Sequence, residues 1–195
     1  MRKIRKFYKK KLLFFIQFFR IFTHRMMSSN EARSDYSHKL QPVIIEGNGE
    51  ITLGRCTLGY WPAPYFLNGS IYIEARATTA QVFISDGVII NNNAVIIAES
   101  TRIYIGKDTI IGTDLTIYDS DFHNLNPLMR HSGIANSAPV EIGENVFMGS
   151  KVTILKGVKI GNNTVIACGS LVTKSIPANS LAGGVPAKII SHCLP

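Results

Sequence analysis

The segment Asp119–His123 (DSDFH) places a histidine next to two carboxylates, a combination suited to proton transfer. Imidazole titrates near neutral pH and is the usual base for removing the proton of a hydroxyl group. A carboxylate hydrogen-bonded to the far ring nitrogen would fix the tautomer and stabilise the imidazolium, whereas the simpler alternative is that both aspartates only close a turn. We predict His123 as a general base, with Asp119 and Asp121 as its supporting residues.

The same D-x-D-x-H pattern also contains donor types that bind metal ions. Only His131 lies near His123 in the sequence, and its spacing does not complete a histidine-rich zinc site. We therefore expect no metal.

The element that must position these residues has a period of six. Aliphatic residues recur at this spacing in one run of six, in two runs of three, and more weakly in one pair: Ile142, Met148, Ile154, Ile160, Ile166 and Val172; Ile84, Ile90 and Ile96; Ile105, Ile111 and Ile117; Ile45 and Ile51. Neither a helix nor a half-buried strand has this period. It predicts short strands joined by Gly- and Asn-rich turns, with stacked units sharing one aliphatic core.

Two motifs make the chain resemble the hexapeptide-repeat acyltransferases, a family that includes galactoside, maltose, nodulation-factor and polysaccharide O-acetyltransferases. They are Ile142–Lys188 and Ile117–Pro127, and the resemblance covers roughly residues 43–191. It implies an all-β fold, a left-handed parallel β-helix of triangular section with three hexapeptides per coil. It also implies a homotrimer with active sites between neighbouring subunits. The handedness rests on the resemblance alone, because crossovers are normally right-handed.

The resemblance also assigns roles to residues. The pattern H-N-L-N-P from His123 is similar to the family's H-P-L-D-P, in which the histidine is the general base. Acetyl-CoA is the implied acyl donor, contacted by Ser150, Cys168, Thr173, Lys174 and Lys188. The two lysines suit its phosphates, although they could also be ordinary surface charges. Small residues at Gly149, Ala167 and Gly169 are expected to leave backbone amides open to pantetheine.

An acceptor contact is implied near Asn91–Asn93, with Asn92 the nearest match. The alternative for Asn92 is a structural place at a coil corner, since Asn tolerates left-handed backbone. Two further segments are expected to close the ends of the repeat. Gly183, Gly184 and Pro186 would cap the last coil, and Gly59–Phe66 (GYWPAPYF) is either a cap of the first coil or a loop on the acceptor side.

Residues 1–25 form a separate basic, amphipathic segment with nine Lys or Arg and no acid. Its apolar run, Leu12–Phe22, is too short to cross a bilayer, which needs roughly 20 residues. Aromatic and aliphatic residues lie at helical spacing, at Ile4, Phe7, Tyr8, Leu12, Phe15, Phe19 and Phe22. We predict an interfacial helix in peripheral contact with the inner face of the cytoplasmic membrane. A signal peptide and a helix docked on the body or in an oligomer interface are the alternatives.

Residues 26–42 are polar and are predicted to be a linker, so the repeat domain is assigned to 43–195. The chain of 195 residues has a net charge of +8, but the part after residue 25 carries 12 basic and 13 acidic residues. A nearly neutral body gives no support to nucleic-acid binding. The three cysteines are far apart and odd in number, which suits a cytoplasmic, reducing location.

We predict transfer of an acetyl group from acetyl-CoA to a hydroxyl of a saccharide acceptor, with a surface-polysaccharide or lipid-linked precursor favoured by the basic segment. N-acetylation of an amino-sugar nucleotide is the alternative within the same chemistry. A non-catalytic trimeric scaffold and a metal-dependent hydratase are the alternatives from other classes. Serine acetyltransferase is a weaker match, because that family carries a larger helical domain before the prism.

Overall fold

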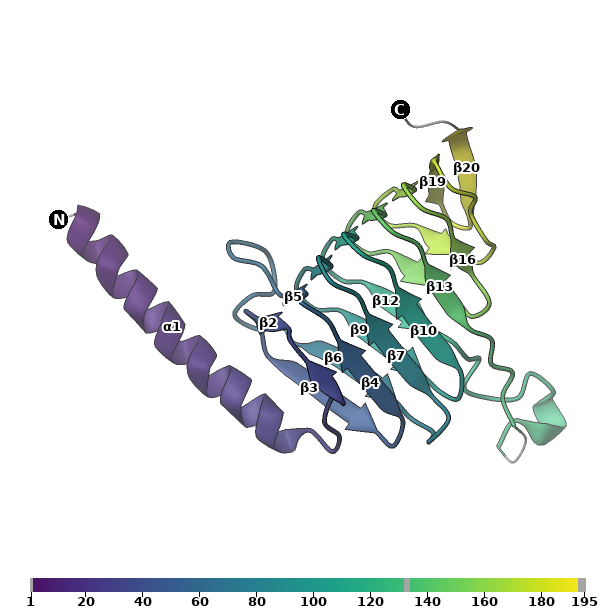
Figure 1. Cartoon of the computed structure of the whole chain (residues 1–195), viewed down its shortest axis with the longest axis horizontal. Helices are drawn as coiled ribbons and strands as arrows, with labels where there is room; N and C mark the ends of the chain where they lie inside the picture. Colours follow the sequence, from purple (N-terminus) through teal and green to yellow (C-terminus); the bar gives the residue numbers. More distant parts are fainter. Residues whose placement is uncertain (1, 132–133, 193–195) are drawn as a thin grey trace.

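The computed structural model describes residues 2–131 and 134–192, in which one helix precedes a prism of stacked coils (Figure 1). The helix is α1 (Arg2–Met27). Its side chains are described from Tyr8 onward except Lys10, so the predicted positions Ile4 and Phe7 lie outside the described side chains. No helix in the described ranges is both long enough and apolar enough to cross a membrane.

Three sheets form the sides of the prism, and successive strands of a sheet are parallel and come from successive coils, apart from the antiparallel last pair of sheet B. Sheet A contains β1 (Ser34–Asp35), β4 (Glu50–Leu53), β7 (Gln81–Ile84), β10 (Arg102–Ile105), β13 (Val140–Ile142) and β16 (Lys159–Ile160). Sheet B contains β2 (His38–Lys39), β5 (Thr57–Leu58), β8 (Ile89–Ile90), β11 (Ile110–Ile111), β14 (Phe147–Met148), β17 (Val165–Ile166), β19 (Ser180–Gly184) and β20 (Ala187–His192). Sheet C contains β3 (Val43–Gly47), β6 (Ile71–Ala75), β9 (Val95–Ala98), β12 (Thr116–Tyr118), β15 (Thr153–Ile154) and β18 (Leu171–Val172).

The aliphatic residues that recur every six positions form the core of the prism. Every residue of the predicted runs is at most 1% exposed, except Ile45 at 6%. The period arises because each coil turns through three sides and each side directs one aliphatic side chain inward. In-register pairs such as Ile90 with Ile111, and Ile111 with Met148, then stack these side chains into columns. The predicted solenoid is confirmed.

The predicted linker is part of the prism. Strands β1 and β2 pair in parallel with β4 and β5, so residues 34–39 already belong to the first coil. Helix α1 also runs past residue 25 to Met27. The prediction of a linker over 26–42 was wrong from residue 34 onward, because these two-residue strands have polar sequences with no aliphatic signal.

Both ends of the repeat have a defined structure. At the C-terminal end, β19 and β20 form an antiparallel hairpin around Gly184 and Ala187, as expected for a cap. At the N-terminal end, the Gly59–Phe66 segment lies between β5 and β6 and supports α1. Gln17 Nε2 and Arg20 Nη1 each donate a hydrogen bond of 2.8 Å to Phe66 O. The structure therefore shows that this segment binds α1, a role that neither prediction named.

Candidate active site

His123 lies in a loop that leaves the prism between β12 and β13 and contains the short helix η1 (Pro127–Met129) (Figure 1). Phe122 holds the base of this loop in a left-handed conformation, with φ of 59°. Its ring meets Tyr118 edge to face at 5.0 Å, and the Arg76 guanidinium lies 5.3 Å from the ring centre. Because Phe122 turns back onto the prism, His123 is left exposed. Neither ring nitrogen of His123 has a hydrogen-bond partner among the described residues.

Asp119 is fully buried, and its carboxylate serves the neighbouring coil. It accepts hydrogen bonds from the backbone N of Glu99, Ser100 and Thr101, at 2.6, 3.3 and 2.8 Å, and from Thr101 Oγ1 at 2.7 Å. The structure thus places Asp119 as the anchor of the turn after β9 and does not bring it to the His123 ring. This geometry matches the alternative interpretation of Asp119, in which its carboxylate closes a turn.

Replacing Asp119 with Ala should destabilise the fold. Three partly buried amides and a hydroxyl would lose a charged acceptor that is itself fully buried, so we expect the free energy of unfolding to fall by about 3 kcal/mol. Urea unfolding followed by circular dichroism measures this. Asp121→Ala is the matched control and should cost less than about 1 kcal/mol, because its ion pair is partly solvated. Equal midpoints for the two variants would contradict the anchoring role.

Asp121 is the carboxylate nearest to His123 along the loop. The His123 backbone N donates to Asp121 O at 2.7 Å, but no side-chain hydrogen bond or ion pair joins the two residues. The buried Oδ2 of Asp121 lacks a hydrogen-bond partner within the described residues and lies 3.4 Å from Lys156 Nζ. This contact is an ion pair without hydrogen-bond geometry. Lys156 was not predicted from the sequence, and it brings a cation to the base of the histidine loop.

A second charged network supports the same corner of the prism. Arg76 donates to Glu74 Oε1 through Nε at 2.8 Å and to Glu99 Oε2 through Nη1 at 2.5 Å. The hydrogen bond from Arg76 holds the pKa of Glu74 below its ordinary value, and burial raises the pKa of Tyr72 to about 12. Glu74 therefore stays ionised and Tyr72 stays protonated at neutral pH. Arg76 is fixed between two carboxylates beneath Phe122.

The predicted cofactor residues Ser150 and Cys168 lie at another corner, in the turns that follow β14 and β17. The turns are stacked so closely that a Cβ on Gly149 would lie 2.6 Å from Cys168 N. The amides of Gly149, Ala167 and Gly169 are all used by neighbouring coils, so the expectation that they stay open is wrong. The backbone N–H groups of Ser150 and Cys168 are different. Within the described chain neither has a hydrogen-bond partner, which leaves two donors one coil apart.

The remaining predicted cofactor residues are exposed. Thr173 and Lys174 follow β18, at the corner that also carries the histidine loop, whereas Lys188 pairs with Gly183 in the C-terminal hairpin. Neither lysine makes an ion pair with the described acidic residues, so both cations are open to an anionic ligand. Within one copy the predicted site is therefore divided. His123 and Lys174 lie at one edge of sheet C, and Ser150 and Cys168 lie at the other.

Asn92 does not reach the surface. It is fully buried, its Oδ1 accepts from Tyr60 N at 3.0 Å, and its Nδ2 donates to Tyr60 O at 3.0 Å and Pro64 O at 2.8 Å. These bonds use the whole amide to fix the loop that supports α1. The structure thus corrects the predicted acceptor contact, because a buried and saturated amide has no face for a saccharide.

Among the residues that the structure describes, no three His, Cys, Asp or Glu side chains gather as a metal site would require. Cys56 is buried and burial raises its pKa to about 11, so its thiol stays protonated. Cys168 is exposed, and Cys193 lies outside the described residues.

A prism of stacked hexapeptides with an outward histidine loop defines the hexapeptide-repeat class of proteins. Residues 139–174 match the family model described as bacterial transferase hexapeptide, six repeats. Over these residues the chain matches a hexapeptide-repeat transferase family, and its prism is a left-handed parallel β-helix like those of its solved neighbours.

Three known proteins are similar to the chain. The galactoside O-acetyltransferase of Escherichia coli strain K12 is 36% identical over 129 residues, which are 66% of this chain and 58% of that protein. The crystal structure of the polysialic acid O-acetyltransferase OatWY is 26% identical with a TM-score of 0.59, covering 83% of both chains. A hexapeptide-repeat acetyltransferase of Vibrio cholerae O1 biovar eltor, complexed with acetyl coenzyme A, is 25% identical with a TM-score of 0.54, covering 80% of this chain and 73% of that one.

The chain spans between 51% and 65% of the length of the curated relatives it matches first.

Proposed function

We propose that this protein transfers an acetyl group from acetyl-CoA to a hydroxyl group of a saccharide, with His123 as the general base. The observation that carries this proposal is the exposed imidazole of His123, which lies outside the prism because Phe122 turns back onto it. No described residue makes a hydrogen bond to either ring nitrogen. The relatives described above support the donor and the class of acceptor. A surface-polysaccharide or lipid-linked saccharide precursor is the proposed acceptor type.

The proposed reaction is a direct transfer. A ring nitrogen of His123 takes the hydroxyl proton while the acceptor oxygen attacks the thioester carbonyl. The tetrahedral intermediate collapses by breaking the carbon–sulfur bond, and the imidazolium returns the proton to the departing thiolate of CoA. The N–H groups of Ser150 and Cys168 are proposed donors to the bound acetyl-pantetheine, and Lys174 and Lys188 are proposed partners of its phosphates. Asp121 is retained as a proposed supporting residue.

The division of the site between two corners favours a homotrimer whose active sites lie between copies. The outer face of sheet B offers a surface for this contact. Its outward residues form one apolar column across successive coils, at Ile89, Ile110, Phe147, Val165 and Leu181. Ile110 and Phe147 are 48% and 51% exposed in a single copy. Contiguous exposed apolar surface of this kind marks an interaction site, so we propose sheet B as the contact between copies.

The proposed place of work is the inner face of the cytoplasmic membrane. Tyr8, Leu12, Phe15 and Phe19 are all at least half exposed on α1. Apolar side chains on a helix that begins with basic residues suit the boundary between head groups and acyl chains. We propose that this face of α1 makes a peripheral membrane contact.

Acetyl-CoA binding to the full-length protein is the test of the proposed activity. Isothermal calorimetry should give a dissociation constant in the micromolar range with one site per chain. The double variant Lys174→Ala/Lys188→Ala should weaken binding about tenfold or more, because each lysine would contribute a charge-assisted contact to phosphate. Arg33→Ala is the matched control, since it removes an exposed cation at the far end of the prism. A folded protein that releases no heat with acetyl-CoA would contradict the proposal and leave the scaffold alternative.

A further inference from the structure

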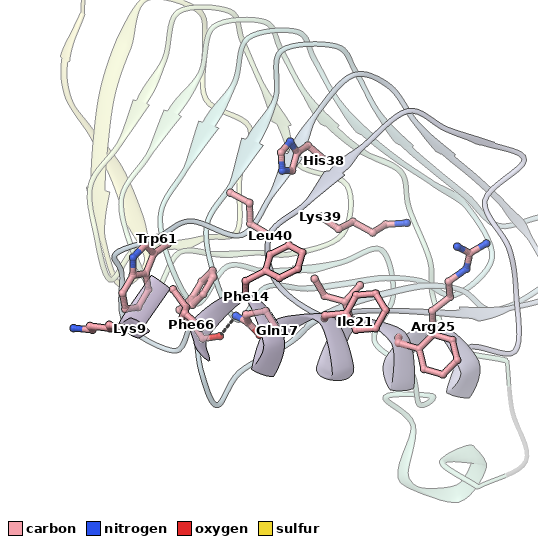
Figure 2. A pocket seen from close by; sticks show the side chains of 13 residues that line it. Lys9, Phe14, Gln17, Ile21, Arg25, His38, Lys39, Leu40, Trp61 and Phe66 are labelled. Carbon is pink, nitrogen blue, oxygen red and sulfur yellow. Dashed lines mark hydrogen bonds between the residues drawn. The ribbon is translucent and has the colours of Figure 1, made fainter. Parts of the chain in front are cut away.

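A groove of about 780 Å³ lies between α1 and the first coils of the prism, away from the candidate active site. Its walls are mostly apolar, and both Phe14 of α1 and Leu40 of the prism line it (Figure 2). Trp61 and Phe66 close one end, with their rings 5.0 Å apart. This volume is within the usual range for a small-molecule site.

Two polar side chains attach α1 to the body beside the groove. Gln17, which is 6% exposed, and Arg20 both bond to Phe66 O, and Arg20 Nη2 also donates to Gly69 O at 2.5 Å. These polar contacts fix the middle of the helix against the loop that Asn92 supports. On either side of Gln17, the groove-lining side chains of Phe14, Phe18 and Phe22 are each more than half exposed.

Charge at the groove has one sign. Lys9, Arg25, His38 and Lys39 all contribute to the lining, and none of the described lining residues is acidic. Lys39 is already paired with Asp35, which lies just outside the lining. Lys9 and Arg25 stand toward opposite ends of the groove in Figure 2. An apolar channel with basic ends is complementary to a molecule that joins a hydrocarbon chain to an anion.

We propose that this groove binds one hydrocarbon chain of an anionic membrane lipid, with the lipid phosphate at one of the basic ends that form the rim. A second copy of α1 is a poor occupant, because residues 1–25 carry nine basic and no acidic residues and would bring like charge to the rim. The bound chain and the outer face of the helix then have separate tasks. Phe14 lines the groove although it is 74% exposed, whereas its neighbour Phe15, 61% exposed, is not part of the lining.

This inference deepens the proposed membrane contact, and the test separates the two. Trp61 is the only tryptophan of the chain and lines the groove, so its emission reports on the occupant. The probe is dodecyl phosphate, titrated as a monomer into the full-length protein, with dodecyl maltoside and inorganic phosphate as the separate arms. We expect a saturable blue shift with one dodecyl phosphate per chain, weaker binding of dodecyl maltoside, and no shift with inorganic phosphate.

Two adjacent phenylalanines provide the matched variants. Phe14→Ser should weaken dodecyl phosphate binding about tenfold or more, whereas Phe15→Ser should leave it within about twofold and instead reduce binding to anionic phospholipid vesicles. Lys9→Gln/Arg25→Gln should lower the affinity for dodecyl phosphate to that for dodecyl maltoside. Leu40→Phe fills the groove without adding polarity and should also weaken dodecyl phosphate binding. It tests the groove independently of any effect of Phe14→Ser on the helix.

Three results would overturn the groove proposal. The first is equal dodecyl phosphate affinity in the wild type and in both Phe14→Ser and Leu40→Phe. The second is a saturable shift with inorganic phosphate alone. The third is a Trp61 shift that follows protein concentration without any amphiphile, which would identify a second copy as the occupant. Loss of vesicle binding by Phe15→Ser with unchanged dodecyl phosphate binding supports both proposals, and unchanged vesicle binding counts against the membrane contact alone.

Discussion

Replacing His123 with Ala should lower kcat by about 10²- to 10⁴-fold, the usual contribution of a positioned general base. The binding of acetyl-CoA should stay within about twofold of the wild type, because the exposed ring makes no contact that supports the predicted cofactor corner. Loss of kcat without loss of donor binding is the signature of a group that acts on the reacting hydroxyl. Steady-state kinetics with a saccharide acceptor, together with calorimetry for acetyl-CoA, provide the two measurements.

The loop itself provides the control. His131 is a second exposed histidine of the same loop, so His131→Ala changes the same residue type in the same surroundings. It should retain most of the activity. Full activity in His123→Ala, or equal losses in the two variants, would contradict the assignment of the base. Parallel assays with an amino-sugar nucleotide would show whether the same base serves an amine, since N-acetylation requires the same proton transfer.

The core of this fold could be read from the sequence because a solenoid repeats one physical requirement. Each side of each coil needs one inward aliphatic side chain, and the next coil needs another directly above it. Met148 shows that the inward position requires an apolar side chain and not a β-branched one, since it is unbranched and is still completely buried. The hairpin after Ser180 was also predictable, because glycines and a proline end the period where the sheet needs a cap.

The first coil could not be read in this way. Residues 34–39 pair with the second coil through backbone hydrogen bonds, and their polar side chains carry no sign of that pairing. The contact between α1 and the Gly59–Phe66 segment could not be predicted for a related reason. Gln17 and Arg20 looked like interruptions of an apolar run, yet they are the residues that bind Phe66 O.

The candidate site was predictable as a set of residues but not as a geometry. The motif around His123 pointed to the right loop, whereas the partners of Asp119 lie 18 to 20 residues earlier in the chain. Partners at that distance depend on the register of one coil over the next. The same register places Tyr60 and Pro64 over Asn92 and buries a side chain that was predicted to meet the acceptor. Arg76 and Glu99 lie one coil apart, so a known coil length would have predicted their contact as well.

The division of the site between two corners leads to a prediction about mixed trimers. If His123 of one copy works with Cys168 of another, two inactive variants should restore activity when their subunits are exchanged. His123→Ala removes the base, and Cys168→Arg would obstruct the two free amides with a long side chain. In an equal mixture, each interface has a one in four chance of joining two intact halves, so about a quarter of wild-type activity should return.

Two controls make this result specific. A double variant carrying both substitutions, mixed with either single variant, should restore nothing, because one half of every interface is then always defective. Phe147→Asp should prevent the exchange by breaking the trimer, since a charge at the centre of the apolar column on sheet B would have to be buried without a partner. Phe83→Asp, on the outer face of sheet A, should leave the trimer intact as judged by light scattering.

Recovery of activity in the mixture would show that neither corner is sufficient alone, which is what the separation of His123 from Ser150 and Cys168 requires. Mixed trimers that form and remain inactive would mean that both halves of the site belong to one copy. The histidine loop would then have to fold back across sheet C, over the outward residues of β12, β15 and β18. A trimer unaffected by Phe147→Asp but broken by Phe83→Asp would instead move the contact between copies from sheet B to sheet A.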